Sequence, residues 1–252
     1  MILGRRDVLE VRRLCKAFSG LKAVDDAALD VRAGEIVALI GPNGAGKTTL
    51  FACIAGFHKP DSGVVRLDGA DITGRAPHRI CAAGMVRTFQ ITQPFATISV
   101  RENIMVGAYA RTSDRDAAAA RAEAIARQVG MGAQLDRRGA DLTVAGRKRL
   151  ELARALATGP RLLLLDEVMA GLNPTEIGEI VEVIRAIRTG GVTILLIEHV
   201  MQAVTSLAER VYVLNQGRVI AEGTPAQVAA DAGVVEAYLG HGAAARLGGA
   251  HA

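Results

Sequence analysis

The sequence predicts an α/β fold in which helices flank a mostly parallel sheet, with antiparallel strands near the N-terminus and a separate helical subdomain. Short apolar runs at residues 36–40, 162–165 and 192–197 have the length and composition of strands buried on both faces. A glycine-rich loop follows the first run, and helical patterns alternate with the later ones. Between them, residues 97–157 contain long stretches of helix-forming residues.

Length and hydropathy limit the class of protein. The chain has 252 residues, and 50% of them are hydrophobic, which suffices for a sizeable core and argues against disorder. No apolar run reaches the roughly 18 residues that a membrane-spanning helix needs. Residues 1–6 lack the apolar region of a secretory signal. We therefore expect a soluble intracellular protein that could still dock onto a membrane protein.

Charge and cysteine content argue against two further classes. The net charge is +4, but Trp is absent, aromatic residues make up 3% of the chain, and no basic patch is interleaved with aromatics. We therefore expect no nucleic-acid partner. Cys15, Cys53 and Cys81 are widely spaced and form no CxxC pair, so they predict reduced thiols and neither a disulfide framework nor a zinc site.

The elements up to the middle of the chain follow from local patterns. Alternating polarity predicts antiparallel strands at residues 8–14 and 27–31. A central strand at 35–40 and a helix at 46–54 come next, and a strand at 64–67 leads into an Asp-Gly turn. In the helical part, Ser99 and Glu102 have the spacing of a capping box, and Ala, Arg and Glu dominate residues 114–129.

Strands and helices alternate again after residue 160. The predicted elements are a strand at 161–166, a helix at 176–188, a strand at 192–197, a helix at 201–209, and two strands at 211–214 and 219–221 around the turn Asn215-Gln-Gly217. We divide the chain into a core of residues 1–96 and 158–240, a helical subdomain of residues 97–157, and a flexible tail of residues 241–252.

The segment Gly41-Pro-Asn-Gly-Ala-Gly-Lys47-Thr48 matches the pattern G-x-x-x-x-G-K-[ST] in full. Its glycines allow a tight turn whose N–H groups face inward, and the helix that follows directs its positive N-terminal end at an anion. Lys47 can reach the β- and γ-phosphates of ATP, and the Thr48 hydroxyl can ligand Mg²⁺. The pattern indicates a P-loop NTPase core. The predicted ATP-binding residues of this segment are Gly41, Pro42, Asn43, Gly44, Ala45, Gly46, Lys47, Thr48 and Thr49.

A second motif lies at the end of the apolar run at 162–165, where two carboxylates follow, Asp166 and Glu167. An acidic residue at a strand end beside the phosphate loop can hold Mg²⁺, directly or through water. Glu167 could then polarise the attacking water as a general base. The alternative is a structural acid pair at a strand end, but the phosphate loop favours the catalytic interpretation.

These motifs and their order resemble the ATP-binding cassette ATPases over nearly the whole chain. The resemblance implies that Phe18 stacks on adenine and that Gln90 senses Mg²⁺ and contacts a transmembrane partner. It also implies that His199 contacts the γ-phosphate and acts in catalysis beside Glu167. The segment 170–173 resembles the family's loop that meets the opposite subunit.

The family's signature segment, Leu-Ser-Gly-Gly-Gln, corresponds here to Leu142-Thr143-Val144-Ala145-Gly146. The helix at 149–156 that follows it matches well and sets this register. Thr143 retains a hydroxyl, but Ala145 replaces a glycine that lets the backbone approach a phosphate. A negative φ would tolerate the added Cβ, and otherwise the contact loosens. A register shifted by one residue would restore a glycine and misplace the hydroxyl. The resemblance implies that Thr143, Val144, Ala145 and Gly146 contact the ATP of a partner subunit.

The resemblance also implies the partners. One copy carries two half-sites, so it must pair with itself or with a related ATPase subunit, with ATP and Mg²⁺ as the cofactors. Residues 167–174 and 222–239 resemble the branched-chain amino acid importers, whose relatives carry urea and short amides. This branch implies permease subunits, a solute-binding protein, and a place at the cytoplasmic face of the inner membrane. The alternatives are a cassette that extracts lipid or lipopolysaccharide, and a non-transport ATPase of the same superfamily.

Overall fold

The N-terminal part folds into an antiparallel sheet with the strand order β2-β1-β4-β5. Strands β1 (Asp7–Phe18) and β2 (Leu21–Arg32) pair through a tight turn, with Phe18 opposite Leu21. Strand β4 (Ser62–Leu67) pairs with β1, and β5 (Ala70–Asp71) with β4. The expected early strands are confirmed, and both extend beyond their predicted bounds.

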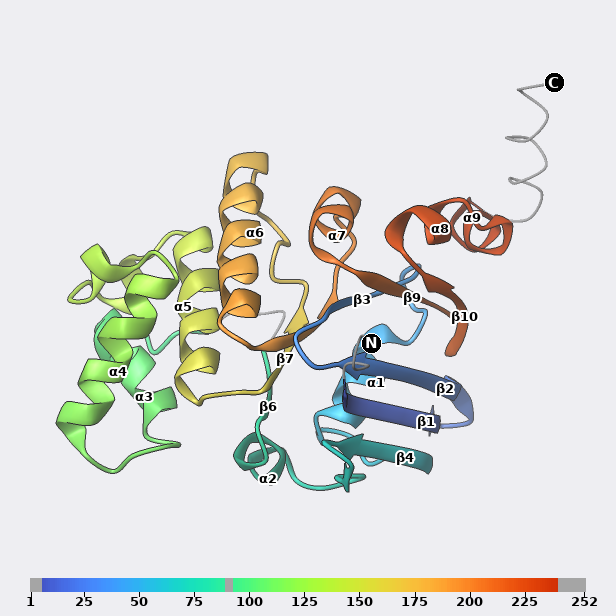
Figure 1. Ribbon diagram of the computed structural model, residues 1–252, viewed down its shortest axis with the longest axis horizontal. Helices are drawn as coiled ribbons and strands as arrows, with labels where there is room; N and C mark the ends of the chain where they lie inside the picture. Colours follow the sequence, from blue (N-terminus) through green and yellow to red (C-terminus); the bar gives the residue numbers. More distant parts are fainter. Residues whose placement is uncertain (1–5, 89–92, 240–252) are drawn as a thin grey trace, which may run out of the picture. The chain divides into compact units, whose positions relative to one another are not determined.

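The computed structural model describes residues 6–88 and 93–239, and Gln90 and the tail at 241–252 therefore lie outside the described residues. The chain forms two compact units (Figure 1). The first comprises residues 1–77 and 195–252, and the second comprises residues 78–194. The predicted helical subdomain of residues 97–157 lies within the second unit. Strand β8 (Thr193–Ile197), buried along its whole length, has residues in both units.

The first unit also contains a set of three strands. Strand β3 (Ile36–Ile40) runs parallel to β9 (Arg210–Asn215), and β10 (Arg218–Gly223) pairs antiparallel with β9. All five residues of β3 are buried, as its continuous apolar run predicts. The turn between β9 and β10 has positive φ at Gln216 and Gly217, which is the conformation that suits the twist of a two-residue hairpin. The predicted hairpin is confirmed.

Helices complete the first unit. They are α1 (Lys47–Ile54), α7 (Met201–Leu207), α8 (Pro225–Ala229) and α9 (Ala232–Leu239). Helix α1 begins one residue after the predicted start, and α7 ends two residues before the predicted end. Helices α8 and α9 are not predicted from the sequence. Thr224 and Gln227 form a capping box that starts α8, with Pro225 at its first position.

The second unit pairs β6 (Met85–Arg87) in parallel with β7 (Leu162–Asp166). Its helices are α3 (Val100–Ala108), α4 (Arg115–Gln128), α5 (Val144–Ala157) and α6 (Pro174–Thr189), and α2 (Pro77–Ala82) begins at the boundary between the units. The capping box of Ser99 and Glu102 at the start of α3 is confirmed. Helix α3 packs against both α4 and α5 (Figure 1).

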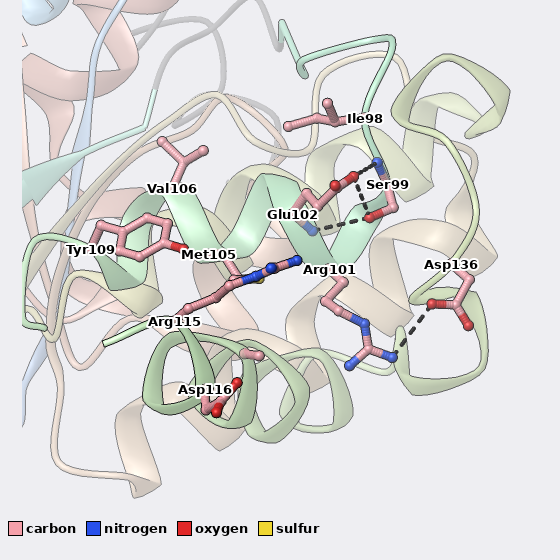
Figure 2. A pocket seen from close by; sticks show the side chains of 11 residues that line it. Ile98, Ser99, Arg101, Glu102, Met105, Val106, Tyr109, Arg115, Asp116 and Asp136 are labelled. Atoms are coloured by element: carbon pink, nitrogen blue, oxygen red, sulfur yellow. Dashed lines mark hydrogen bonds and ion pairs between the residues drawn. The ribbon is translucent and has the colours of Figure 1, made fainter. Parts of the chain in front are cut away.

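Helices α3 and α4 border a hollow of about 670 Å³ (Figure 2). Val106 and Tyr109 of α3 line it and are 45% and 47% exposed. Arg101 and Arg115 also line it, and Arg101 pairs with Asp136 across 3.4 Å. The hollow therefore combines exposed apolar side chains with charges of both signs.

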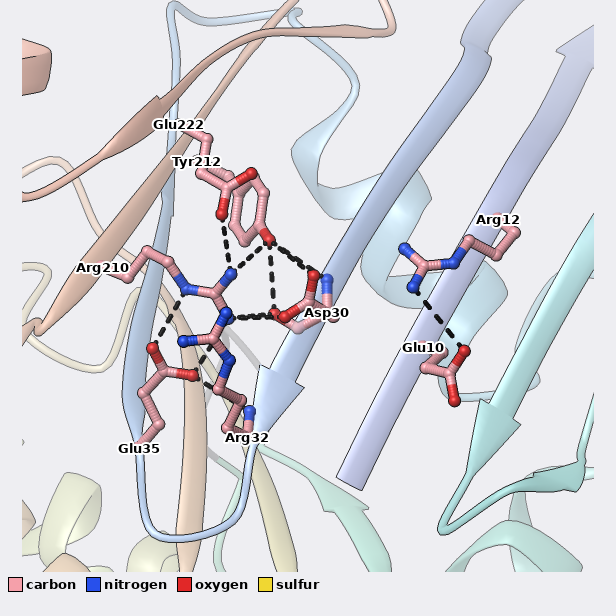
Figure 3. Close-up of polar contacts among 8 residues, drawn as sticks. All are labelled: Glu10, Arg12, Asp30, Arg32, Glu35, Arg210, Tyr212 and Glu222. Atoms are coloured by element: carbon pink, nitrogen blue, oxygen red, sulfur yellow. Dashed lines mark hydrogen bonds and ion pairs between the residues drawn. The ribbon is translucent and has the colours of Figure 1, made fainter. Parts of the chain in front are cut away.

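An ion-pair cluster joins the two sheets of the first unit (Figure 3). Arg210 of β9 contacts Asp30 of β2 at 2.8 Å, Glu35 at 3.0 Å and Glu222 of β10 at 2.7 Å. The Arg210 side chain is only 11% exposed, so three carboxylates surround one buried cation. The Tyr212 hydroxyl accepts a further hydrogen bond from Arg210. The cluster fixes the antiparallel sheet to the strands that carry the phosphate loop.

None of the helices within residues 6–88 and 93–239 is long and apolar enough to cross a membrane. Cys15, Cys53 and Cys81 are all free thiols, as expected, and Cys53 is the buried one.

Candidate functional site

The phosphate loop joins β3 to α1 within the first unit. Gly46 is the N-cap of α1 with a φ of 102°, and no side chain of the described residues caps this helix. The positive end of this helix therefore carries no side-chain cap from that part of the chain, and a helix start of this kind can bind an anion. A Cβ on Gly41 would lie 2.0 Å from the Leu214 carbonyl oxygen, and one on Gly46 would lie 2.1 Å from that of Ala23. Glycine is required at both positions because backbone atoms crowd them.

The Lys47 side chain lies against this loop. Its ammonium donates hydrogen bonds to the carbonyl oxygens of Gly41 at 2.7 Å and Pro42 at 3.0 Å, and the residue is 8% exposed. The loop itself is held by the β9–β10 hairpin, since the Gly217 N–H donates to the Ala45 carbonyl at 2.8 Å. A buried ammonium beside the start of a helix forms a cradle for phosphate.

The remaining loop residues differ in exposure. Asn43, Gly44 and Thr48 are exposed, whereas Pro42 and Thr49 are half-buried. The Thr48 side chain is thus on the accessible side of the first turn of α1, where its hydroxyl can meet a metal ion.

Phe18 closes the first strand in the same unit. It is 42% exposed, and its ring meets the His58 ring edge-on with centroids 5.3 Å apart. The Lys16 ammonium lies 5.3 Å from the Phe18 ring centroid and pairs with Asp61 at 2.8 Å. The Phe18 side chain thus stays partly exposed beside these contacts, which an adenine stacking partner requires.

His199 follows β8 in the first unit and is exposed. The residue before it, Glu198, is 1% exposed. The predicted loop residues, Phe18 and His199 therefore belong to one unit, whereas Asp166, Glu167 and the signature-like segment belong to the other.

In the second unit, β7 ends in the predicted carboxylates. Asp166 is 1% exposed, and its Oδ2 accepts a hydrogen bond of 2.6 Å from Arg87 Nη2. The next residue, Glu167, is half-buried and has a φ of 49°, a left-handed conformation uncommon for a residue with a side chain. Lys148 of α5 donates to the Glu167 carbonyl oxygen at 3.4 Å. The strand end thus holds one fixed carboxylate beside a second, more accessible one.

The signature-like segment forms the start of α5. Thr143 is the N-cap, and its hydroxyl oxygen accepts a hydrogen bond of 3.1 Å from the Gly146 N–H. Val144 is 54% exposed at the first helical position, whereas Ala145 is 8% exposed. Ala145 is not among the described residues with positive φ, so its Cβ adds no backbone strain.

Three residues at these sites were not predicted to act there. Arg87 and Lys148 contact the strand end of β7, and Tyr238 of α9 contacts the phosphate loop, because the backbone of Gly41 hydrogen-bonds its hydroxyl. Burial raises the pKa of Tyr238, and the bond from Gly41 partly offsets this rise. The sequence held only a weak signal for them, since each contact joins residues far apart in the chain.

Two predicted metal ligands carry hard oxygen atoms of the kind that Mg²⁺ prefers. Thr48 of the first unit offers a hydroxyl, and Asp166 of the second unit offers a carboxylate. Among the described residues, no cluster of three or more His, Cys, Asp or Glu could hold a metal without substrate.

Comparison with known proteins gives two family matches. Residues 24–170 match the model described as "ABC transporter", and residues 218–244 match "Branched-chain amino acid ATP-binding cassette transporter". The chain is 39% identical to the high-affinity branched-chain amino acid transport ATP-binding protein BraF of Pseudomonas aeruginosa, over 93% of this chain and 98% of that one. It is also 39% identical to the high-affinity branched-chain amino acid transport ATP-binding protein LivG of Escherichia coli, over 92% of this chain and 98% of LivG.

Solved structures give the same picture. A nucleotide-free ATP-binding cassette from an ABC transporter superposes with a TM-score of 0.86 at 31% identity, covering 94% of this chain and 100% of the other. The ADP conformation of MJ1267, an ATP-binding cassette of an ABC transporter, gives a TM-score of 0.85 at 31% identity with the same coverage. The predicted α/β fold, with its parallel and antiparallel strands, is confirmed.

Proposed function

This chain belongs to the ATP-binding cassette (ABC) transporter family, as one of its ATP-hydrolysing subunits, and from that premise we propose that it powers the import of branched-chain amino acids or related small amides. The relatives named for such transport cover nearly the whole chain. The C-terminal match at residues 218–244 supports the same branch. The geometric observation that carries the ATPase assignment is the Lys47 ammonium held on the loop carbonyls.

We assign the following roles within one subunit. The loop at residues 41–49 and Lys47 hold the phosphates of ATP, while Phe18 stacks on adenine. Glu167 polarises the attacking water, and His199 contacts the γ-phosphate. When bound, Mg²⁺ neutralises charge on the β- and γ-phosphates. Its proposed protein ligands are Thr48, Gln90 and Asp166.

The site is proposed to be complete only in a dimer. The start of α5 in one copy, from Thr143 to Gly146, would meet the ATP that the loop of the other copy holds. This arrangement is supported by the exposed Val144 and by the capped, regular start of α5. Closure of the dimer then depends on contacts that exist only while the γ-phosphate is present, so ATP hydrolysis opens the dimer again. The partner copy is either a second copy of this chain or a related ATPase subunit.

We propose that the helical subdomain, residues 97–157, gives the chain its contact with permease subunits at the cytoplasmic face of the inner membrane. The core, in this proposal, consists of residues 1–96 and 158–240. The contact is supported by the hollow beside α3, where Val106 and Tyr109 expose apolar surface (Figure 2). A solute-binding protein would complete the transporter.

The permease contact can be tested by co-purification. Val106→Asp should release the chain from membranes that contain its permeases, because the substitution places a charge on the apolar contact. Ile220→Asp is the matched control, since Ile220 is 42% exposed on β10, outside the helical subdomain. Equal retention of both variants would contradict the proposed contact.

The transport function is tested with proteoliposomes that contain the chain and its permeases. Uptake of labelled leucine should require ATP and should be lost with Lys47→Ala, because the phosphates lose their ammonium partner. Lys22→Ala, which alters a 67% exposed lysine, should transport normally. Normal leucine uptake with Lys47→Ala would contradict the assignment of the loop. ATP hydrolysis without uptake of any branched-chain amino acid would contradict the substrate.

A further inference from the structure

Asp166 and Arg87 form a buried ion pair at the ends of two neighbouring parallel strands. The distance from Arg87 Nη2 to Asp166 Oδ2 is 2.6 Å, and the two side chains are 9% and 1% exposed. Burying a carboxylate is costly unless a cation or several donors compensate it. Arg87 supplies that compensation in the absence of a metal ion.

Backbone pairing sets this contact. Arg87 lies opposite Leu164 in the register of β6 and β7, and Asp166 lies two residues further along β7 on the same face. Thr88 fixes the strand end, since its N–H donates to the Leu164 carbonyl at 2.9 Å and its hydroxyl accepts from the Asp166 N–H at 3.2 Å. The guanidinium therefore meets a carboxylate whose backbone is already held.

Arg87 engages one of the two oxygens of the Asp166 carboxylate, Oδ2. Asp166 would hold a metal ion, directly or through water, with the same carboxylate. The guanidinium and the metal would be two cations on one carboxylate in a buried site, where charges interact more strongly than in water.

We propose that Arg87 is a positioning residue that stands in for the metal ion, holding the Asp166 carboxylate in place and weakening the hold of the site on Mg²⁺. The inference rests on the proposed role of Asp166 as a metal ligand. Arg87 gives a preset carboxylate when ATP arrives, and its repulsion of Mg²⁺ lets the metal leave with the products. An ion pair that served only to stabilise the fold would not alter metal affinity.

The test measures binding, in a Glu167→Gln background that prevents turnover. The dissociation constant of ATP is determined by equilibrium dialysis with Mg²⁺ and again with EDTA, and the ratio of the two reports the coupling between metal and protein. Arg87→Met, which removes the charge, should enlarge the gain in ATP affinity from Mg²⁺ about three- to tenfold relative to the parent. If Arg87→Met does not fold, Arg87→Gln takes its place in the test. This variant keeps a donor for Oδ2 without the charge, and it should also enlarge the gain in ATP affinity from Mg²⁺.

Two control variants distinguish a wrong role for Arg87 from a wrong metal assignment at Asp166. Arg161→Met removes the same charge beside the first residue of β7, where Arg161 donates to the Ala83 carbonyl, and should leave the Mg²⁺ gain within about twofold of the parent. Asp166→Asn should lower the gain. If Asp166→Asn lowers the gain and the Arg87 variants leave it unchanged or lower it, only the proposed role of Arg87 is overturned. An unchanged gain with Asp166→Asn would overturn the metal assignment on which it rests.

Discussion

Gly46 and Ala23 approach so closely that a Cβ on Gly46 would lie 2.1 Å from the Ala23 carbonyl oxygen. The contact joins the start of α1 to strand β2, since Ala23 is part of that strand. The loop conformation therefore depends on a second strand as well as on its own glycines, and on positive φ at Gly46.

Gly46→Ala should abolish ATP binding while leaving most of the fold intact, because the added methyl group must push the loop away from β2. Isothermal titration with ATP measures the loss. Gly191→Ala is the matched control, since Gly191 has a similar φ of 93° with nothing within 4 Å of the added Cβ. ATP binding by Gly46→Ala at the level of this control would contradict the steric argument.

Arg210→Met should lower the free energy of unfolding by about 2–4 kcal/mol at pH 7, because it leaves the buried Glu35 and the half-buried Asp30 without their shared cation. Urea denaturation measures the change. Arg218→Met removes an exposed partner of Asp25 and should change the urea midpoint little, since the Arg218 side chain is 61% exposed. Equal shifts in the two variants would show that burial does not set the strength of the Arg210 cluster.

The same variant should change how stability depends on pH. Burial raises the pKa of Asp30, but the hydrogen bond and charge of Arg210 outweigh it, so the net pKa is lowered. The stability that this lowered pKa contributes is present above the unfolded pKa of about 3.9, and it is lost as the pH falls through the lower pKa of the folded state. Without Arg210, the pKa of Asp30 loses its strongest lowering influence, whereas the hydrogen bond from Tyr212 and the charge of Arg32 remain. The stability gap between parent and Arg210→Met should therefore narrow as the pH falls below about 3.9, and a constant gap across that range would contradict this assignment.

Cys53 should react with thiol reagents far more slowly than Cys15 or Cys81. It is 2% exposed, and burial raises its pKa to about 11, so little thiolate exists at pH 8. Labelling with iodoacetamide followed by peptide mass spectrometry gives the three rates separately. Fast labelling of Cys53 in the folded protein would show that α1 opens beneath the phosphate loop, and urea should make the rates similar.

Local patterns in the sequence predicted most of the fold. The hairpin around Gln216 and Gly217, the capping box at Ser99 and the buried strand β3 all depend on neighbours in the chain, and each is confirmed. Helix α5 starts before the predicted 149–156 because Thr143 caps it, although Val144 and Gly146 are poor helix formers. Tertiary packing of its later residues outweighs that preference.

The contacts around the proposed site were harder to predict than the site residues themselves. The phosphate loop and the Asp166-Glu167 pair have fixed residue types because they meet a ligand, so a motif identifies them. Arg87 meets Asp166 across 79 positions of the sequence. Tyr238 meets Gly41 although the two residues lie in different sequence segments of the first unit. Such pairs follow from strand register and helix packing, which single-sequence patterns do not encode.

Ala145→Gly should leave ATP hydrolysis equal or faster, because removing the methyl group lets the start of α5 approach a phosphate more closely. It should also lower the free energy of unfolding by about 0.5–1 kcal/mol through helix propensity. Ala155→Gly is the matched control, since Ala155 is 7% exposed in the same helix and should show the stability loss without any gain in rate. A large loss of activity confined to Ala145→Gly would show that the signature register is wrong.

The central claim is that the loop at residues 41–48 holds ATP and that Glu167 drives its hydrolysis. It is tested most directly by single-turnover release of phosphate from γ-labelled ATP, measured with the parent and with Glu167→Gln. Glu167→Gln should bind ATP within about twofold of the parent and release phosphate at least about 100-fold more slowly. Release of phosphate by Glu167→Gln at the parent rate would contradict it.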